Sequence, residues 1–129
     1  MFLKQMMLKM GFAPTWVEMV MRCVRSVRFS VRLNGGLSDT FLPTRGLRRG
    51  DPLSPYLFLF CVEGFSALLR QAQIDKELAS VSFGDGPTIT NFLFADDSVV
   101  FMEASQSNLM ALRSVLQKYE VCSGQRVNF

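Results

Sequence analysis

The chain contains no histidine, and this absence excludes several classes of catalytic and metal site. Histidine is the general base of Ser-His-Asp triads, and it supplies zinc ligands in HExxH sites and Cys₂His₂ fingers. The three cysteines, Cys23, Cys61 and Cys122, show no Cys-x-x-Cys spacing. Each lies in an apolar helical context, so we expect small buried residues in a reducing compartment. Any catalysis must therefore rely on carboxylates, backbone amides, Lys, Arg or bound metal ions.

Long hydrophobic runs are also missing. The longest unbroken one, Tyr56 to Val62, is far too short to cross a bilayer. Residues 1–10 lack the cleavage pattern of a secretory signal and the Arg and Ser content of a transit peptide, so we expect an opening helix. These absences predict an intracellular protein without a membrane partner.

The composition itself is that of a globular protein. The 129 residues are 49% hydrophobic and 19% charged, and they contain no repeat, linker or low-complexity segment. A chain of this size can bury a core of its own, and we expect a single domain over residues 1–129. The net charge of +3 is too small to identify a partner.

Helix signals occur at three further places. Residues 15–24 begin with the Thr-x-x-Glu spacing of a capping box. A second helix is expected over residues 54–73, with Ser54 or Asp51 as alternative N-caps. Its stretch 56–62 is apolar on every side, so this part should be deeply buried. Residues 105–122 form an amphipathic helix that stops at Gly124. Its apolar stripe consists of Leu109, Leu112, Leu116 and Tyr119.

Strand signals lie between these helices. Residues 26–33 alternate apolar and polar side chains, Asn34-Gly35-Gly36 is a turn signal, and residues 39–44 return as a second strand. A short strand is expected near 81–83, and another begins at 127–129. The order of elements predicts an α+β fold of antiparallel hairpins and packed helices.

Two adjacent carboxylates, Asp96 and Asp97, stand between the apolar runs 89–94 and 98–102. Both runs predict half-buried strands, so the acidic pair should lie in or beside the turn of a hairpin. Neighbouring carboxylates repel each other unless a cation or a shared proton offsets the cost, and Mg²⁺ binds one or two such groups readily. Ordinary turn chemistry and solvation is the alternative, and the pair alone does not decide between them.

Several motifs, taken in order, closely resemble the reverse transcriptases of non-LTR (long-interspersed-element type) retrotransposons. Residues 45–58, with Gly50-Asp51-Pro52 at their centre, are similar to the second conserved block of that family, and Phe94-Ala95-Asp96-Asp97 looks like its catalytic block. Residues 123–129 are similar to the block that ends the palm, and Lys9 to Phe12 with Trp16 resembles plant members. The resemblance implies a partial reverse-transcriptase palm.

This resemblance implies roles for individual residues. Asp96 and Asp97 would be catalytic metal ligands for Mg²⁺, with Mn²⁺ as an alternative, in template-directed nucleotidyl transfer. The partners would be an RNA template, a DNA primer and deoxynucleoside triphosphates. Gly50 would let the backbone approach the nucleotide or the template base, and Asp51 would anchor its loop through backbone amides.

Five arginines are candidates for nucleic-acid or phosphate contacts: Arg28, Arg32, Arg45, Arg48 and Arg49. For those in the 45–55 loop the alternative is a solvated loop, and for Arg28 and Arg32 it is an exposed strand face. Arg49 departs from the family, which usually has Gln before the Gly-Asp pair. Arg is longer and charged, so it changes the contacts expected there.

The resemblance also implies parts that this chain does not match. The family has another metal-binding Asp just before the segment corresponding to Phe2-Leu3-Lys4, on a first palm strand, and it has fingers and thumb. Without them we expect little or no polymerisation by the chain alone, and self-association through an uncovered sheet edge. Two alternatives remain: a non-catalytic nucleic-acid-binding remnant, or an unselected product of a decayed element. By family the compartment would be nuclear or cytoplasmic, or an organelle if organelle-encoded.

Overall fold

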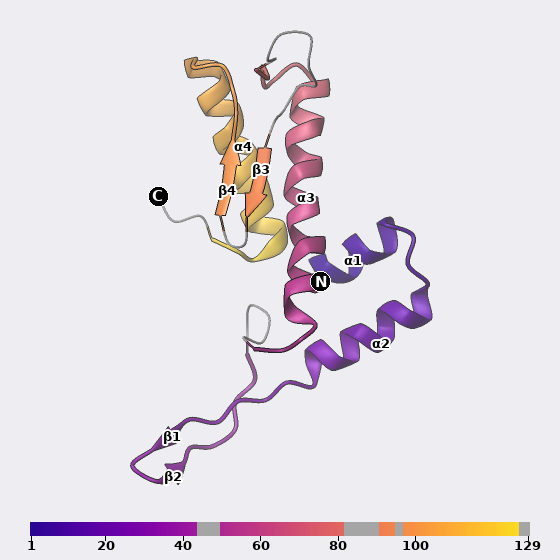
Figure 1. The fold of residues 1–129 in the computed structure, drawn as a ribbon, viewed down its shortest axis with the longest axis vertical. Helices are drawn as coiled ribbons and strands as arrows, with labels where there is room; N and C mark the ends of the chain where they lie inside the picture. The colour runs from indigo at the N-terminus through magenta and orange to yellow at the C-terminus, as the bar shows by residue number, and fades with distance from the viewer. Residues whose placement is uncertain (44–49, 82–90, 95–96, 127–129) are drawn as a thin grey trace. The chain divides into compact units, whose positions relative to one another are not determined.

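The computed structural model describes residues 1–43, 50–81, 91–94 and 97–126. The chain divides into two compact units (Figure 1), the first holding residues 1–61 with 123–125 and the second holding residues 62–122. Helix α3, Ser54–Ile74, contributes its beginning to the first unit and its remainder to the second. Each unit has its own buried side chains, and each is described separately below.

The first unit is built on helices α1 (Phe2–Lys9) and α2 (Pro14–Arg25), together with the start of α3. Apolar residues recur every three or four positions on α2, so one side of the helix can be buried. Val17, Val20 and Met21 are buried accordingly, and Val24 packs against them. The buried cluster of this unit consists of Leu3, Met7, Val17, Val20, Met21 and Leu57.

The start of α2 differs from the predicted capping box. The N-cap residue is Ala13, no side chain caps the helix, and Pro14 provides the first turn. The Glu18 carboxylate instead accepts a hydrogen bond from the Lys4 ammonium of α1 at 2.9 Å. Glu18 therefore pairs with a charge on the neighbouring helix and does not cap its own helix. Pro14 has no N–H, so the first turn has one fewer donor that needs a cap.

A hairpin of strands β1 (Arg32–Leu33) and β2 (Gly36–Leu37) extends from α2 as an exposed arm (Figure 1). Asn34 and Gly35 both have positive φ, 48° and 83°, as a two-residue hairpin turn requires, so the predicted turn is confirmed. The strands differ from the prediction. β1 covers only the end of the expected strand 26–33, β2 lies before the expected strand 39–44, and within 39–44 only Phe41 forms an isolated bridge. Ser38 N–H bonds to Val31 O, whereas Phe29 pairs with Phe41, which leaves one extra residue on the returning strand, a β-bulge.

The second unit combines most of α3 with strands β3 (Asn91–Phe94) and β4 (Asp97–Val100) and with helix α4 (Gln106–Ser123). The rings of Phe65 and Tyr119 lie 5.3 Å apart and connect α3 to α4. Its buried apolar residues include Val62, Phe65, Leu69, Ala72, Leu78 and Val115. Helices with small antiparallel sheets confirm the α+β class. The expected strands at 81–83 and 127–129 fall mostly or wholly outside the described residues.

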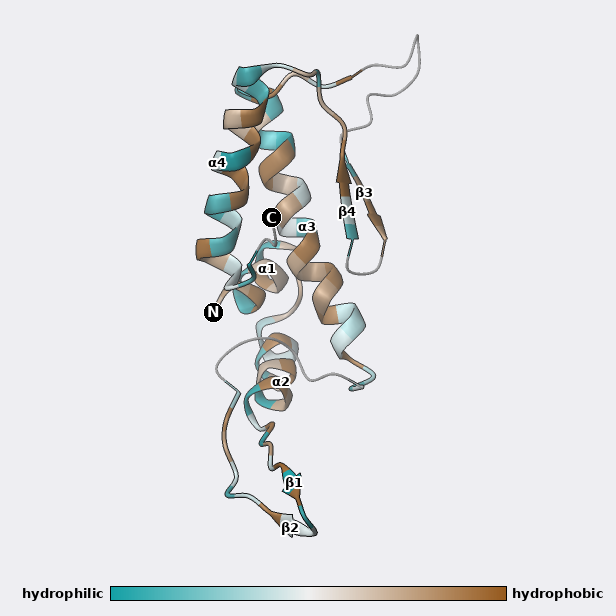
Figure 2. Ribbon diagram, turned by 90° about the vertical axis from the view of Figure 1, so that its left-hand side faces the viewer, coloured by the Kyte–Doolittle hydropathy of each residue, from teal (hydrophilic) through white to brown (hydrophobic). Residues whose placement is uncertain are grey.

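The first half of α3 is not deeply buried, contrary to the sequence prediction. Leu57 is 4% exposed, but Tyr56 is 65% and Leu59 is 59% exposed. A segment that is apolar on every side predicts burial on every side only if other segments surround it, and α1 and α2 cover the Leu57 side. By length and composition α3 could also cross a membrane, a test that the core helices of globular proteins pass as well. Figure 2 shows the hydrophobic residues along it.

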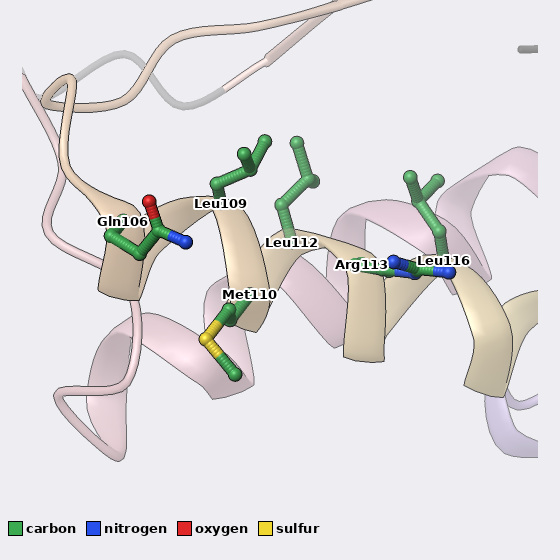
Figure 3. A pocket seen from close by; sticks show the side chains of 6 residues that line it. All are labelled: Gln106, Leu109, Met110, Leu112, Arg113 and Leu116. Carbon is green, nitrogen blue, oxygen red and sulfur yellow. The ribbon is translucent and has the colours of Figure 1, made fainter.

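Helix α4 ends at Ser123, directly before Gly124, as predicted, but of its predicted apolar stripe only Tyr119 is buried. Its buried residues are Asn108, Val115 and Tyr119, while Leu109 is 57% exposed. The predicted leucine stripe points into an open apolar groove instead (Figure 3). The groove is lined by Gln106, Leu109, Met110, Leu112, Arg113 and Leu116.

The cysteine prediction is also corrected. Cys23 and Cys122 are exposed, and Cys61 is partly buried. Burial raises the pKa of the Cys61 thiol from 9.0 to about 11 because the thiolate loses solvation. The apolar neighbours of these cysteines in the sequence did not predict their burial correctly, because burial depends on which other segments pack against each residue.

Candidate functional site

The acidic pair belongs to the β3–β4 hairpin, whose four residue pairs run from Asn91–Val100 to Phe94–Asp97. Because Phe94 pairs with Asp97, only residues 95 and 96 connect the strands. Asp97 is exposed and opens β4 beside the turn, so the predicted hairpin and the predicted position of Asp97 are both confirmed. Asp96 lies outside the described residues.

The two faces of this hairpin have different surroundings. Side chains alternate along a strand, so Asn91 and Leu93 share one face while Phe92, Phe94 and Asp97 share the other. The Asn91 amide donates a hydrogen bond to Ser66 Oγ of α3 at 2.9 Å, which turns the first face toward that helix. Phe92 is 55% and Phe94 81% exposed on the second face. Asp97 therefore lies on the open face, among exposed aromatic rings.

A buried amide holds the base of the same hairpin. The side chain of Asn108 in α4 bonds to both backbone groups of Ala79 and to the carbonyl of Glu103. Sequence reasoning missed this residue because it followed the apolar stripe of the helix. The available signal was a polar residue three positions after Ser105, whose hydroxyl caps the Asn108 N–H at 3.2 Å.

The donor chemistry at the hairpin suits a hard divalent cation. Carboxylate oxygens are the ligands that Mg²⁺ prefers, and water or phosphate can complete its shell around one or two of them. In the part of the chain that the structure describes, no three acidic, Cys or His side chains are grouped closely enough to bind a metal ion. The acidic pair can thus supply part of a metal site.

The Gly50-Asp51 segment precedes α3 in the first unit. Gly50 has φ +82°, a conformation that other residues rarely adopt. An Asp51 carboxylate oxygen accepts a hydrogen bond from Leu53 N–H at 2.9 Å, and the Asp51 carbonyl accepts one from Ser54 N–H at 3.1 Å. The predicted backbone anchoring by Asp51 is confirmed. The nearby candidates Arg45, Arg48 and Arg49 fall outside the described residues.

Arg28 and Arg32 lie on the exposed β1–β2 arm. Arg32 opens β1, whereas Arg28 precedes the isolated Phe29–Phe41 bridge and is outside any strand; both side chains are exposed. Within residues 1–43, 50–81, 91–94 and 97–126, neither of them forms an ion pair with a carboxylate. Both belong to the first unit with Gly50, whereas Asp97 belongs to the second.

Ion pairs near this arm lie on the helices. Glu18 interacts with Lys4 and, at 3.7 Å, with Arg25. The hydrogen bond and the charge of Lys4 lower the pKa of Glu18 below its usual value, and the positive charge of Arg25 adds to that effect. Glu18 therefore neutralises cations of α1 and α2, which leaves the arm as a separate basic feature.

Comparison with known proteins adds independent observations. The family described as reverse transcriptase (RNA-dependent DNA polymerase) has a model that matches residues 2–128. An uncharacterized mitochondrial protein of Arabidopsis thaliana is 46% identical over 67 residues, which cover 51% of this chain and 55% of that protein. A retrovirus-related Pol polyprotein from a type-2 retrotransposable element of Drosophila melanogaster is 34% identical over 109 residues, 84% of this chain and 9% of the polyprotein. The matched regions thus span about half of one relative and under a tenth of the other.

Proposed function

This chain belongs to the reverse transcriptase family, and we propose that it forms part of the palm of a retrotransposon RNA-directed DNA polymerase. One observation carries the proposal. Within the match over residues 2–128, the hairpin register places Asp97, which is exposed, at the first position of β4, directly after Asp96 in the sequence. The same continuous match supports a single domain over residues 1–129. The similarity to the Pol polyprotein supports an origin among non-LTR elements.

In this proposal Asp96 and Asp97 are the metal ligands of the chain. Bound Mg²⁺, or Mn²⁺ in its place, would activate the attacking 3′-oxygen and stabilise the triphosphate charge. The protein would supply position: the pairing of β3 with β4 holds Asp97 at one end of a short hairpin, and the Asn91–Ser66 hydrogen bond attaches one face of that hairpin to α3. Asp96 is proposed as the principal ligand and Asp97 as the weaker one.

The loop before α3 would contact the substrates. Gly50 carries no side chain, and among the described residues a Cβ there would meet no atom within 4 Å, so a nucleotide or a template base could approach this backbone. Arg45, Arg48 and Arg49 would bind phosphates of the template or of the incoming triphosphate. Asp51 sets the shape of this loop through its hydrogen bond to Leu53.

Polymerisation by the 129-residue chain alone is not expected, because the chain matches the family at two of the three expected carboxylates. Primer extension on an RNA template in the presence of Mg²⁺ tests this point. Extension that disappears in Asp96→Ala would overturn the expectation of inactivity and would strengthen the assignment of Asp96.

Metal binding tests the site itself and does not depend on activity. Mn²⁺ can be titrated into the chain and followed by electron paramagnetic resonance. We expect Asp96→Asn to weaken binding by about tenfold or more and Asp97→Asn to weaken it less. Asp39→Asn on the β1–β2 arm removes the same charge and serves as the matched control. Equal weakening by all three substitutions would show diffuse charge attraction and would contradict the proposed site.

A second candidate function is nucleic-acid binding without catalysis. The observation that favours it is the exposure of Arg28 and Arg32 in one segment of the first unit, with no carboxylate partner among the described residues. Cations in this arrangement can follow a phosphate backbone. Such binding would survive Asp96→Ala, which separates it from the polymerase proposal.

Salt dependence tests this second function. Binding of single-stranded RNA should weaken as salt rises, and the double substitution Arg28→Ala/Arg32→Ala should reduce the log–log slope by about 1.4, since each phosphate contact contributes about 0.7. Arg22→Ala/Arg113→Ala changes the net charge equally and is the control. An affinity that does not change with salt would exclude this function.

A further inference from the structure

The segment that carries the acidic hairpin has both of its ends held by one side chain. Asn108 is 3% exposed, and its amide oxygen accepts a hydrogen bond from Ala79 N–H at 2.9 Å. Its amide nitrogen donates to Glu103 O at 2.8 Å and to Ala79 O at 3.4 Å. Ala79 precedes the segment and Glu103 follows β4, so α4 is bonded to both ends of the segment.

The two ends also contact each other directly. Glu103 N–H donates to Ala79 O at 3.3 Å, beside the Asn108 amide. Together these bonds form what we term the amide clamp, consisting of Asn108, Ala79 and Glu103. A primary amide offers one acceptor and two donor hydrogens on a single planar group, and the clamp uses both kinds. No apolar side chain can replace it, and an ionised carboxylate would face the two carbonyl oxygens.

We propose that Asn108 is a positioning residue for the β3–β4 hairpin and thereby for Asp97, the proposed metal ligand that opens β4. The clamp fixes the distance between Ala79 and Glu103 at the open end of the hairpin. Because β3 is paired with β4, this attachment also restrains the opposite end, where Asp97 lies. The role in metal binding rests on the proposed function, whereas the role in holding the hairpin does not.

A second tether makes the inference testable without loss of the fold. The Asn91–Ser66 hydrogen bond attaches the hairpin to α3 independently of the clamp. Removing the Asn108 amide should therefore loosen the hairpin and leave α3 and α4 packed through Phe65 and Tyr119. The consequence should be a weaker and less ordered metal site in a folded protein.

The experiment compares Asn108→Ala with Val115→Ala in the whole chain. Val115 is also 3% exposed on α4, and its truncation destabilises the same unit without touching the clamp. Urea unfolding gives the loss of stability for each variant, and Mn²⁺ titration gives the dissociation constant. We expect Asn108→Ala to raise the Mn²⁺ dissociation constant about tenfold, with Val115→Ala unchanged. Equal weakening by both variants would reduce Asn108 to a structural residue and overturn the proposal.

Hydrogen exchange separates failure of the clamp from failure of the proposed function. If the unmodified chain binds no Mn²⁺ at the hairpin, the metal site is wrong, and the clamp is judged by amide exchange alone. Asn108→Ala must then accelerate exchange in β3 and β4 more than in the rest of the second unit. Uniform acceleration there, as expected for Val115→Ala, would overturn the clamp as well.

A pH-dependent rescue adds a signature that general destabilisation would not produce. In Asn108→Asp the protonated carboxyl offers one donor and one acceptor, and the ionised form offers acceptors only. Burial beside two carbonyl oxygens favours the protonated form, so hairpin exchange in this variant, measured against Asn108→Ala at each pH, should approach that of the unmodified chain as the pH falls and the carboxyl takes up its proton. The absence of any such recovery would contradict the hydrogen-bonding role of Asn108.

Discussion

Leu59 and Leu69 lie on the same helix, α3, but their surroundings differ. Leu69 is 0% exposed and Leu59 is 59% exposed. The sequence predicts deep burial for Leu59, because Leu59 lies in the continuous apolar stretch 56–62 and Leu69 does not. Replacing each leucine by alanine therefore tests the packing directly, with identical chemistry and the same helix as the host.

The expected magnitudes follow from these exposures. Truncating a fully buried leucine costs about 2–5 kcal/mol, which combines lost burial with the cavity that remains. At Leu59 only about two fifths of the side chain is removed from water, so the cost should be about 1 kcal/mol, reduced further because alanine favours helix. For a domain of this length, Leu69→Ala should lower Tm by about 8–20 °C and Leu59→Ala by about 4 °C or less.

Urea unfolding followed by far-UV circular dichroism measures both free energies, and the single tryptophan, Trp16, reports on the first unit by fluorescence. Coincidence of the two signals shows whether the units unfold together. If Leu59→Ala costs as much as Leu69→Ala, the exposed face assigned to α3 is wrong. A cost at Leu59 that grows with protein concentration would instead locate the burial in an interface between copies.

Four further predictions concern other residues. Because the pKa of Cys61 is raised to about 11, a thiol reagent at pH 8 should modify Cys23 and Cys122 before Cys61. As the unfolded thiol loses its proton first, folding stability should fall as pH rises from about 9 to about 11, and Cys61→Ala should abolish that loss in pH-dependent urea titrations. Gly50→Ala should lower the free energy of unfolding by about 1–2 kcal/mol, because Gly50 has a φ of +82°. Gly50→Asn should lower it less, since Asn tolerates this conformation better. Equal losses in urea unfolding would show that backbone conformation is not the cause. Self-association through the open hairpin face should be reduced by Phe94→Lys in light-scattering measurements. Leu37→Lys, at a similarly exposed position of the other hairpin, should have no effect. A monomeric unmodified chain would contradict this expectation.

The elements that were predicted correctly depend on short-range chemistry. The turn at Asn34-Gly35 requires residues that tolerate positive φ, and the hairpin around Asp97 follows from two apolar runs joined by a short connection. Helix α4 begins after Ser105 and ends before Gly124 for similarly local reasons. The candidate site was found in the same way, because the carboxylate pair and its place between strands are visible in a few adjacent residues.

The predictions that failed concern which side of an element is covered. The Leu109 stripe of α4 faces an open groove, while the polar Asn108 is buried one position away. Periodicity gives the width of an apolar face, but a shift of one residue turns a helix by about 100°, and only packing partners decide which orientation is realised. The capping box at Glu18 failed for a related reason, since Lys4 of another helix lies within 2.9 Å.

The sequence by itself determined the family, the adjacency of the carboxylates Asp96 and Asp97, and the turn at Asn34-Gly35, because motifs and turn chemistry can be read from short runs of neighbouring residues. Only the tertiary structure decided that Asp97 lies on the open face of its hairpin and that Asn108 bonds to both ends of the segment. Ala79 and Asn108 are distant in the chain, and no local preference of either residue specifies the other. Their contact arises because folding places α4 against the base of the hairpin, where a buried amide must find hydrogen-bond partners.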